Sequence, residues 1–132
     1  MKKGFTCGAF DLLHPGHILM LKEVHDQCDF LVVGLHTDPT IDRKEKNKPI
    51  ETVEERKTRL EACKYVDEII LYNTEEELYK LLKELNPDVR FLGADWEGKC
   101  FTGDDLPIKV VFNTRCHSYS SSNLRKRILE QE

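Results

Sequence analysis

Five short segments of the chain are rich in apolar and β-branched residues, which is the composition of strands buried in a parallel sheet. They cover residues 4–7, 30–35, 66–71, 89–92 and 108–112. Most of the segments between them are longer and carry apolar residues at helical spacing or begin with helix-capping residues. The pattern therefore predicts strands that alternate with helices along most of the chain.

Sequence signals also predict where the helices begin. Pro15 suits the first position of a helix, because its missing N–H would have no partner there. Two further helices, over residues 52–63 and 74–85, start with a threonine followed three residues later by a glutamate, the capping-box pattern: Thr52 with Glu55, and Thr74 with Glu77. The last helix is expected to begin between residues 120 and 122 and to carry its apolar residues on one face: Leu124, Ile128 and Leu129.

Strands alternating with helices indicate a parallel α/β sheet with right-handed crossovers. We therefore predict a Rossmann-like α/β fold with a five-stranded parallel sheet flanked by helices. In such folds ligands bind beyond the carboxyl ends of the strands, where the strand order reverses. The polar, basic stretch from Thr37 to Pro49 follows a predicted strand and is expected to be a mobile loop.

Length and composition limit the protein class. The chain has 132 residues, the size of one domain, which we assign to residues 1–132. No apolar run approaches the length that spans a bilayer, and the N-terminus lacks the apolar core of a signal peptide. The five cysteines form no CxxC pair, which suits reduced cytosolic thiols. We expect a cytoplasmic protein without a membrane partner.

The formal net charge of −4 argues against general nucleic-acid binding. Positive charge nevertheless gathers in two short stretches, residues 43–48 and residues 125–127. Such clusters are either solvated faces or binding surfaces for small phosphorylated metabolites, and the charge pattern alone leaves both open.

The stretch His14-Pro15-Gly16-His17 is the first candidate site. If Pro15 opens the helix, both imidazoles lie at the helix's positive end, where free backbone N–H groups favour an anion. Two nitrogen donors at this place suit the charge that builds on a phosphate during substitution. Two histidines that only cap the helix are an alternative, and a zinc site that adds Cys7 is another.

A second candidate is the segment that opens the last helix. Ser120, Ser121 and Ser122 supply hydroxyl donors beside unpaired backbone N–H groups, and Arg115 adds a bidentate partner for phosphate. A serine-rich helix cap without a ligand is the plainer interpretation of the same residues.

The stretch from Gly8 to His17 resembles the nucleotide-binding signature of the HxGH nucleotidyltransferases. The whole chain is similar to the glycerol-3-phosphate cytidylyltransferase family, and the likeness runs from Lys2 into the last helix. It includes the strand ending Thr37-Asp38, the Lys44/Lys46 loop, Arg56, the run Tyr65-Val66-Asp67-Glu68 and, as its most specific part, Gly93-Ala94-Asp95-Trp96-Glu97-Gly98-Lys99.

The resemblance implies an enzyme that joins CTP to sn-glycerol 3-phosphate and releases pyrophosphate, with Mg²⁺ accompanying the CTP and with no metal site of the protein's own. The implied catalytic residues are His14, His17, Lys44, Lys46 and Arg115. The implied nucleotide-binding residues are Gly8, Ala9, Phe10, Asp11, Gly16, Lys64, Asp67, Gly93, Asp95, Trp96, Tyr119, Ser120, Ser121 and Ser122. The resemblance also implies a homodimer.

Two departures from the family pattern bear on the substrate. The segment before the last helix lacks the family's glycine at Ser118 and adds His117 and Tyr119, and a common arginine of the family is Lys64 here. The alternatives are therefore a cytidylyl- or adenylyltransferase for another phosphorylated acceptor, such as ethanolamine phosphate, a pentitol phosphate or FMN. A non-catalytic nucleotide sensor that kept the pocket is the alternative from a different class.

Overall fold

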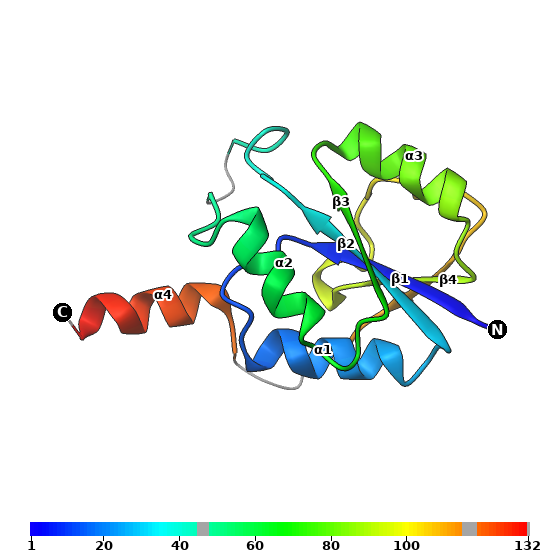
Figure 1. Cartoon of the computed structure of the whole chain (residues 1–132). Coiled ribbons are helices and arrows are strands. Elements are labelled where there is room, and N and C mark those ends of the chain that lie inside the picture. The colour runs from blue at the N-terminus through cyan, green and yellow to red at the C-terminus, as the bar shows by residue number, and fades with distance from the viewer. Residues whose placement is uncertain (45–47, 115–118, 132) are drawn as a thin grey trace.

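A computed structural model describes residues 1–44, 48–114 and 119–131. Its centre is one sheet of five parallel strands in the order β3-β2-β1-β4-β5, which confirms the predicted fold (Figure 1). The strands are β1 (Lys3–Gly8), β2 (Phe30–His36), β3 (Glu68–Tyr72), β4 (Val89–Leu92) and β5 (Lys109–Phe112).

The four predicted helices are present. They are α1 (Pro15–His25), α2 (Val53–Glu61), α3 (Glu75–Leu85) and α4 (Ser121–Glu130). Both predicted capping boxes form, at Thr52 and at Thr74. A short 3₁₀ helix, η1 (Ala94–Trp96), follows β4 and has no counterpart in the sequence prediction.

Most strand boundaries lie within one residue of the prediction, and the largest difference is at the start of β3. β3 begins at Glu68 rather than at Val66, because the residues before it serve other contacts. The backbone N–H of Val66 donates to the Cys63 carbonyl in a turn, and the Asp67 carboxylate accepts the backbone N–H of Leu31 at 2.8 Å.

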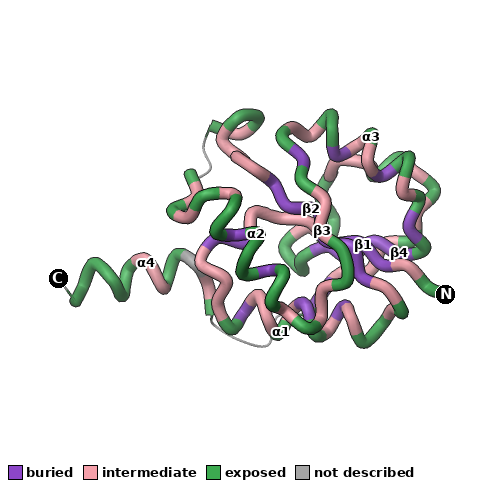
Figure 2. The backbone as a smooth tube through the Cα atoms, viewed as in Figure 1, coloured by how far each residue is buried: buried purple, intermediate pink, exposed green. Residues whose placement is uncertain are grey.

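The helices bury the two faces of the sheet in separate clusters. On one face Leu21 and Val24 of α1 and Leu60 of α2 pack against Leu31 and Val33 of β2. On the other face α3 packs through its leucines, and this second cluster joins Phe5, Val32, Tyr72, Leu78 and Leu82. Figure 2 shows the buried positions concentrated in the strands and on the inner sides of α1, α2 and α3.

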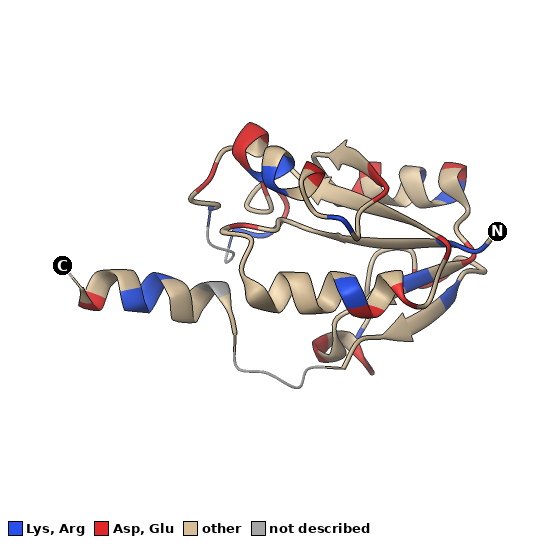
Figure 3. Ribbon diagram, turned by 60° about the horizontal axis from the view of Figure 1, so that its bottom comes forward, with Lys and Arg blue, Asp and Glu red and all other residues tan. Residues whose placement is uncertain are grey.

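The last helix is arranged differently. α4 extends away from the body of the molecule, with the C-terminus at its far end (Figures 1 and 2). Its side chains Ile128 and Leu129 are 48% and 71% exposed, so they do not join the core of this chain. Basic and acidic positions are interspersed over the helices (Figure 3).

The strand order places the site. From β1 the chain moves outward to β2 and β3, and then it returns to the other side of β1 to form β4 and β5. The strand order therefore reverses beside β1, and the crevice outside the carboxyl ends of β1 and β4 is where this fold binds ligands. Among the described helices, none combines the length and the apolar character that crossing a membrane requires.

Candidate active site

The loop between β1 and α1 has an unusual backbone. Phe10 and Leu12 both have positive φ, 50° and 55°, a region that bulky residues rarely occupy. Such conformations cost on the order of 1–3 kcal/mol each and persist only where the surroundings hold them. The Glu51 carboxylate supplies one restraint, since it accepts the Leu12 backbone N–H at 2.9 Å and pairs with Arg59 at 2.7 Å.

Asp11 supplies a second restraint from the middle of the loop. Its buried carboxylate accepts the backbone N–H groups of Ile50 and Glu51 at 2.9 and 3.0 Å, and it pairs with Arg125 of α4 at 2.7 Å. Burial by itself raises the pKa of Asp11, but the hydrogen bonds from Glu51 and Ile50 and the Arg125 charge outweigh it, so the pKa is lowered. The ionised Asp11 carboxylate therefore connects the β1–α1 loop to two distant segments, the backbone before α2 and the helix α4.

The two histidines of the motif form a capping box at the start of α1. The Nδ1 atom of His14 accepts the Gly16 backbone N–H at 3.0 Å, and Nδ1 of His17 accepts the His14 backbone N–H at 3.2 Å. The rings stack with their centroids 3.9 Å apart. Because Nδ1 accepts in both residues, the proton of each neutral ring is on Nε2, the atom that then serves as donor.

The charge state of His17 follows from its surroundings. Burial and the neighbouring His14 lower the pKa of His17 to about 4, although the Asp11 charge acts in the opposite direction. At neutral pH the His17 ring is uncharged and offers an N–H donor rather than a full positive charge.

A buried arginine fixes the strand ends around the loop. The Arg56 guanidinium, 2% exposed, donates to four backbone carbonyls, those of Glu51, Ala9, His36 and Thr37. Ala9 directly follows β1, His36 is the last residue of β2 and Thr37 follows it, and Glu51 lies just before α2. Arg56 thus holds the carboxyl ends of two neighbouring strands in one arrangement.

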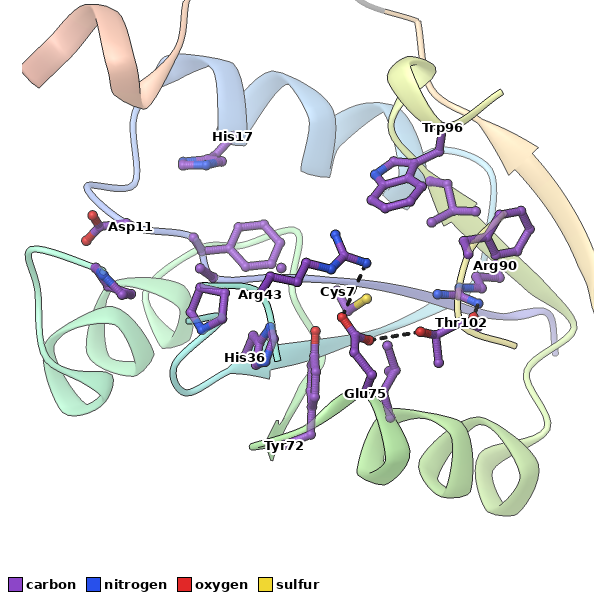
Figure 4. Close-up of a pocket in the computed structure, with 18 of the residues that line it drawn as sticks. Cys7, Asp11, His17, His36, Arg43, Tyr72, Glu75, Arg90, Trp96 and Thr102 are labelled. Carbon is purple, nitrogen blue, oxygen red and sulfur yellow. Dashed lines mark hydrogen bonds and ion pairs between the residues drawn. The ribbon is translucent and has the colours of Figure 1, made fainter. Parts of the chain in front are cut away.

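Two cavities meet at His17. The larger, of about 400 Å³, lies over the carboxyl ends of β1 and β2, and its wall includes Gly8, Ala9, Phe10, Asp11, His36, Arg43, Tyr72, Glu75, Arg90, Trp96 and Arg125 (Figure 4). The smaller, of about 280 Å³, lies between α1 and the ends of β4 and β5. Its wall includes His14, Gly16, Gly93, Asp95, Asn113, Tyr119 and Ser120.

Asn113 is notable among the residues of the smaller cavity. Its side chain is 5% exposed, and its Oδ1 atom has no hydrogen-bond partner within the residues that the structure describes. Buried polar atoms are nearly always paired, so an unpaired one in a cavity wall needs an explanation such as a ligand.

Most of the residues proposed from sequence lie at these two cavities, but some do not. Ser122 and Lys44 are exposed, outside both cavity walls. Lys64 and Asp67 precede β3, so the structure places them at the opposite edge of the sheet and does not bring them to the histidines. Lys46 and Arg115 lie outside the described residues, and of Ser121 only the backbone is described.

Three arginines lie at or behind the larger cavity, although the chemistry of the sequence motifs did not mark them as candidate site residues. Arg43 and Arg125 line the larger cavity, and Arg56 lies behind it, known from sequence only as part of the family likeness. A signal existed for Arg56, which stands four residues before the buried Leu60 and so on the inner side of α2. For Arg125 the signal was weak, since it belongs to a basic run that also suits a solvated face.

The described residues include no group of three or more histidine, cysteine or acidic side chains placed to hold a metal. The zinc alternative with Cys7 therefore gains no support from the described part of the chain. His14 and His17 instead direct their Nδ1 atoms at the backbone, as described above.

Comparisons with known proteins agree with this geometry. A model of the cytidylyltransferase-like family matches residues 5–127. The glycerol-3-phosphate cytidylyltransferase of Bacillus subtilis is 39% identical over 129 residues, which cover 97% of this chain and 98% of that protein. The bifunctional protein HldE of Caulobacter vibrioides is 36% identical over 97% of this chain, and this chain spans 27% of its length.

Among solved structures, the lipopolysaccharide core biosynthesis protein from Thermoplasma volcanium GSS1 is similar, with a TM-score of 0.74 and 31% identity. The match covers 89% of this chain and 99% of that one. The likeness extends over nearly the full length of each chain.

Proposed function

Because the chain belongs to the cytidylyltransferase-like family and is a nucleotidyltransferase enzyme, we propose that it joins CTP to a small phosphorylated alcohol and releases pyrophosphate. Glycerol 3-phosphate is the first acceptor to consider. It is the acceptor named for the Bacillus subtilis relative, whose length this chain matches almost completely.

The observation that carries this proposal is the pair of histidines at the N-terminus of α1. Two imidazoles, of which that of His17 is neutral at pH 7, offer Nε2–H donors at the positive end of a helix, in a crevice where the strand order reverses. These donors suit the negative charge that grows on an α-phosphate as it passes through a five-coordinate transition state. The other helices are capped without histidine, α2 and α3 by a threonine with a glutamate and α4 by Ser120, so a cap alone does not require two imidazoles.

The two cavities suggest how the substrates divide. The nucleoside would occupy the smaller cavity, where the Asn113 Oδ1 atom, which has no partner among the described residues, faces a base and where the start of α4 offers donors to phosphate. The acceptor would occupy the larger cavity and reach the α-phosphate from the side of His17, the residue common to both walls. His14 and His17 would lie at the boundary, where the reacting phosphorus belongs.

In the proposed reaction an oxygen of the acceptor's phosphate attacks the α-phosphorus of CTP. The new bond joins that oxygen to the α-phosphorus, while the bond from the α-phosphorus to the bridging oxygen of the β-phosphate breaks and the electron pair leaves with pyrophosphate. The enzyme contributes position and charge stabilisation, without a covalent intermediate. Mg²⁺ is proposed to accompany the triphosphate, held by phosphate oxygens and water.

A second candidate is the same reaction with a sugar phosphate as acceptor or with ATP as donor. The larger cavity, about 400 Å³, is of the size of small-molecule sites and is compatible with the first variant. The similarity to a lipopolysaccharide core biosynthesis protein points in the same direction.

Pyrophosphate release, measured for each of the four nucleoside triphosphates against a panel of acceptors, tests the proposal. We expect release with CTP and a phosphorylated polyol and little with either substrate alone. Preference for ATP or for FMN would replace the proposal with an adenylyl transfer. Absence of turnover with every pair, together with tight nucleotide binding, would support a nucleotide sensor.

A further inference from the structure

The larger cavity has a polar wall at the end away from the histidines. In Figure 4, His17 and Asp11 lie at one end, and Glu75, Thr102 and Arg90 lie at the other. These three residues come from separate parts of the chain: α3, the loop after η1, and β4. The mechanism described above uses none of them, although each borders the space assigned to the acceptor.

Glu75 provides a carboxylate in this wall. Its two oxygens have different partners. The Thr102 hydroxyl donates to Oε2 at 3.1 Å, and the Arg43 guanidinium contacts Oε1 at 3.5 Å (Figure 4). The side chain is 27% exposed, and the residue lines the cavity. Each carboxylate oxygen accepts more than one hydrogen bond, so Glu75 can also accept from a ligand.

Arg90 provides a donor in the same wall, connected to this carboxylate through Thr102, which both residues contact. The residue is 3% exposed, and its guanidinium stacks over the Phe101 ring with 5.2 Å to the ring centroid while Nη1 donates to the Thr102 carbonyl. Its Nε atom is buried and without a hydrogen-bond partner among the residues described. Within the same ranges of the chain Arg90 also takes part in no ion pair.

Close packing limits the movement of the guanidinium. Gly103 packs against it so closely, with φ of +84°, that an added Cβ would lie 3.0 Å from Nη1 of Arg90 and 2.8 Å from Leu82. A buried donor held in place without a partner costs free energy in the empty protein. That cost is recovered when a ligand supplies an acceptor at this point.

An acceptor and a donor in one cavity wall, both in contact with Thr102, match the hydroxyl groups of a ligand, which both donate and accept hydrogen bonds. A second phosphate would meet the Glu75 carboxylate, and an ammonium group would meet the buried Arg90 charge. We propose that Glu75 and Arg90 bind the hydroxyl groups of the acceptor and so restrict the enzyme to phosphorylated polyols and sugars. This inference rests on the proposed function, because it assigns the larger cavity to the acceptor.

Glycerol 3-phosphate, ribitol 5-phosphate and a hexose phosphate share this chemistry, and their relative rates distinguish them. Propyl phosphate is the matched probe without hydroxyl groups, since it has the three carbons and the phosphate of glycerol 3-phosphate. Ethanolamine phosphate tests the ammonium group. The kcat/KM of each acceptor is measured at saturating CTP.

The variants are Glu75→Leu and Arg90→Met, each nearly matched in size to the residue it replaces. Glu76→Gln is the control, because Glu76 is the next residue on α3 and its side chain is 81% exposed. We expect the wild type to prefer the best polyol phosphate over propyl phosphate by at least a hundredfold. Each variant should reduce that preference about tenfold or more, through the polyol phosphate alone, while Glu76→Gln leaves it unchanged.

Thermal melting and CTP binding show whether each variant is folded, and if Arg90→Met is not, Arg90→Lys takes its place. The inference is overturned if the variants slow all acceptors equally, if propyl phosphate matches the polyol phosphates, or if ethanolamine phosphate is the best acceptor. If the wild type turns over no acceptor, the proposed function has failed. Calorimetric binding of glycerol 3-phosphate and ribitol 5-phosphate to the wild type and both variants then decides the inference: weaker binding in the variants supports it, and equal or absent binding overturns it.

Discussion

Each histidine of the motif has one ring nitrogen engaged by the backbone, and this determines what the other nitrogen can do. Nδ1 of His14 and Nδ1 of His17 accept backbone N–H groups, so the neutral rings carry their protons on Nε2. Stacking of the rings at 3.9 Å holds both in one orientation. The same contacts that cap α1 therefore prepare two donors before any ligand arrives.

Replacing either histidine tests this arrangement. We predict that His14→Ala and His17→Ala each lower the rate by roughly two to three orders of magnitude, because each removes a donor to the transition state. Loss of the cap should cost only about 1 kcal/mol in stability, so both variants remain folded. His25→Ala is the control, since His25 ends the same helix and lies outside both cavity walls. Near wild-type turnover in either variant would disprove the mechanism.

The lowered pKa of His17 predicts a pH dependence. The unfolded chain binds a proton at His17 below about pH 6.5, whereas the folded chain does so only near pH 4. Folding stability should therefore fall as the pH drops from about 6.5 to 4. It should fall further at lower pH, because the pKa of Asp11 is also lowered in the folded state. Melting temperatures across this range measure the effect, and His17→Gln should flatten the part above pH 4. A curve of unchanged slope in that variant would contradict the assignment.

At the residue scale, the sequence predicted the role of residues within one short motif, but it did not predict which residues far apart in the chain contact one another. His14 and His17 are close in sequence, so their geometry follows from the helix that contains them. Asp11 and Arg125 are 114 residues apart, and Glu75 and Thr102 are 27 apart. Such pairs depend on how the whole chain folds, and no local pattern marks them.

At the scale of elements, the β1–α1 loop and α4 depend on each other through Asp11. The Asp11 carboxylate holds two backbone N–H groups and Arg125, and the loop it stabilises has two residues with positive φ. α4 otherwise extends away from the body of the molecule. The salt bridge therefore sets the position of the helix start that is proposed to bind phosphate.

We predict that Asp11→Ala destabilises the protein by roughly 3–5 kcal/mol, because it leaves a half-buried arginine and two backbone donors without a partner. Arg125→Met should cost less, since Asp11 keeps its two backbone hydrogen bonds. Chemical denaturation gives both free energies. Equal losses in the two variants would show that the backbone hydrogen bonds contribute nothing.

The basic loop between β2 and α2 is the second element with a testable role. CTP carries several negative charges, and the acceptor brings another phosphate toward them, so lysines of this loop should lower the barrier when both substrates are bound. We predict that Lys44→Ala and Lys46→Ala lower kcat/KM for the acceptor about tenfold or more, and that added salt slows the wild type in the same direction. Lys80→Ala on α3 is the control. Unchanged kinetics in both loop variants would mean that the basic cluster is only a solvated face.

The elements were predicted well where the signals are local. Capping boxes mark the starts of α2 and α3, and apolar runs mark the strands. η1 was missed because three residues of 3₁₀ helix leave no periodic pattern. The apolar face of α4 was recognised, but its exposure could not be foreseen, since a hydrophobic pattern does not say which surface it meets.

At the scale of the whole molecule, the return of the chain from β3 to β4 brings most of the described candidate residues to one edge of the sheet. Two cavities open there and share His17. A donor and an acceptor bound in them would meet at the histidine pair, which is the geometry that an in-line transfer requires. The sequence pattern of strands followed by polar residues pointed to this edge, where the cavities lie, but it did not predict two separate cavities.

The assembly state is also a property of the whole molecule. We predict a homodimer, because the family resemblance implies one and two-fold pairs are the commonest assemblies of soluble proteins. The exposed side chains of Ile128 and Leu129 on α4 offer apolar area for such a contact. Light scattering at micromolar concentration measures the mass directly, and a value for a single chain of 15.4 kDa would contradict the prediction.

The central claim is the transfer of a nucleotidyl group between two bound substrates, and phosphorus NMR of the products tests it most directly. Wild-type protein is incubated with CTP, Mg²⁺ and glycerol 3-phosphate, and in parallel with ribitol 5-phosphate and a hexose phosphate. The account predicts pyrophosphate and a cytidine diphosphate ester in equal amounts with at least one acceptor, and neither product within the same time with His17→Ala. Pyrophosphate accompanied by CMP in place of the ester, or no consumption of CTP with any acceptor, would contradict it.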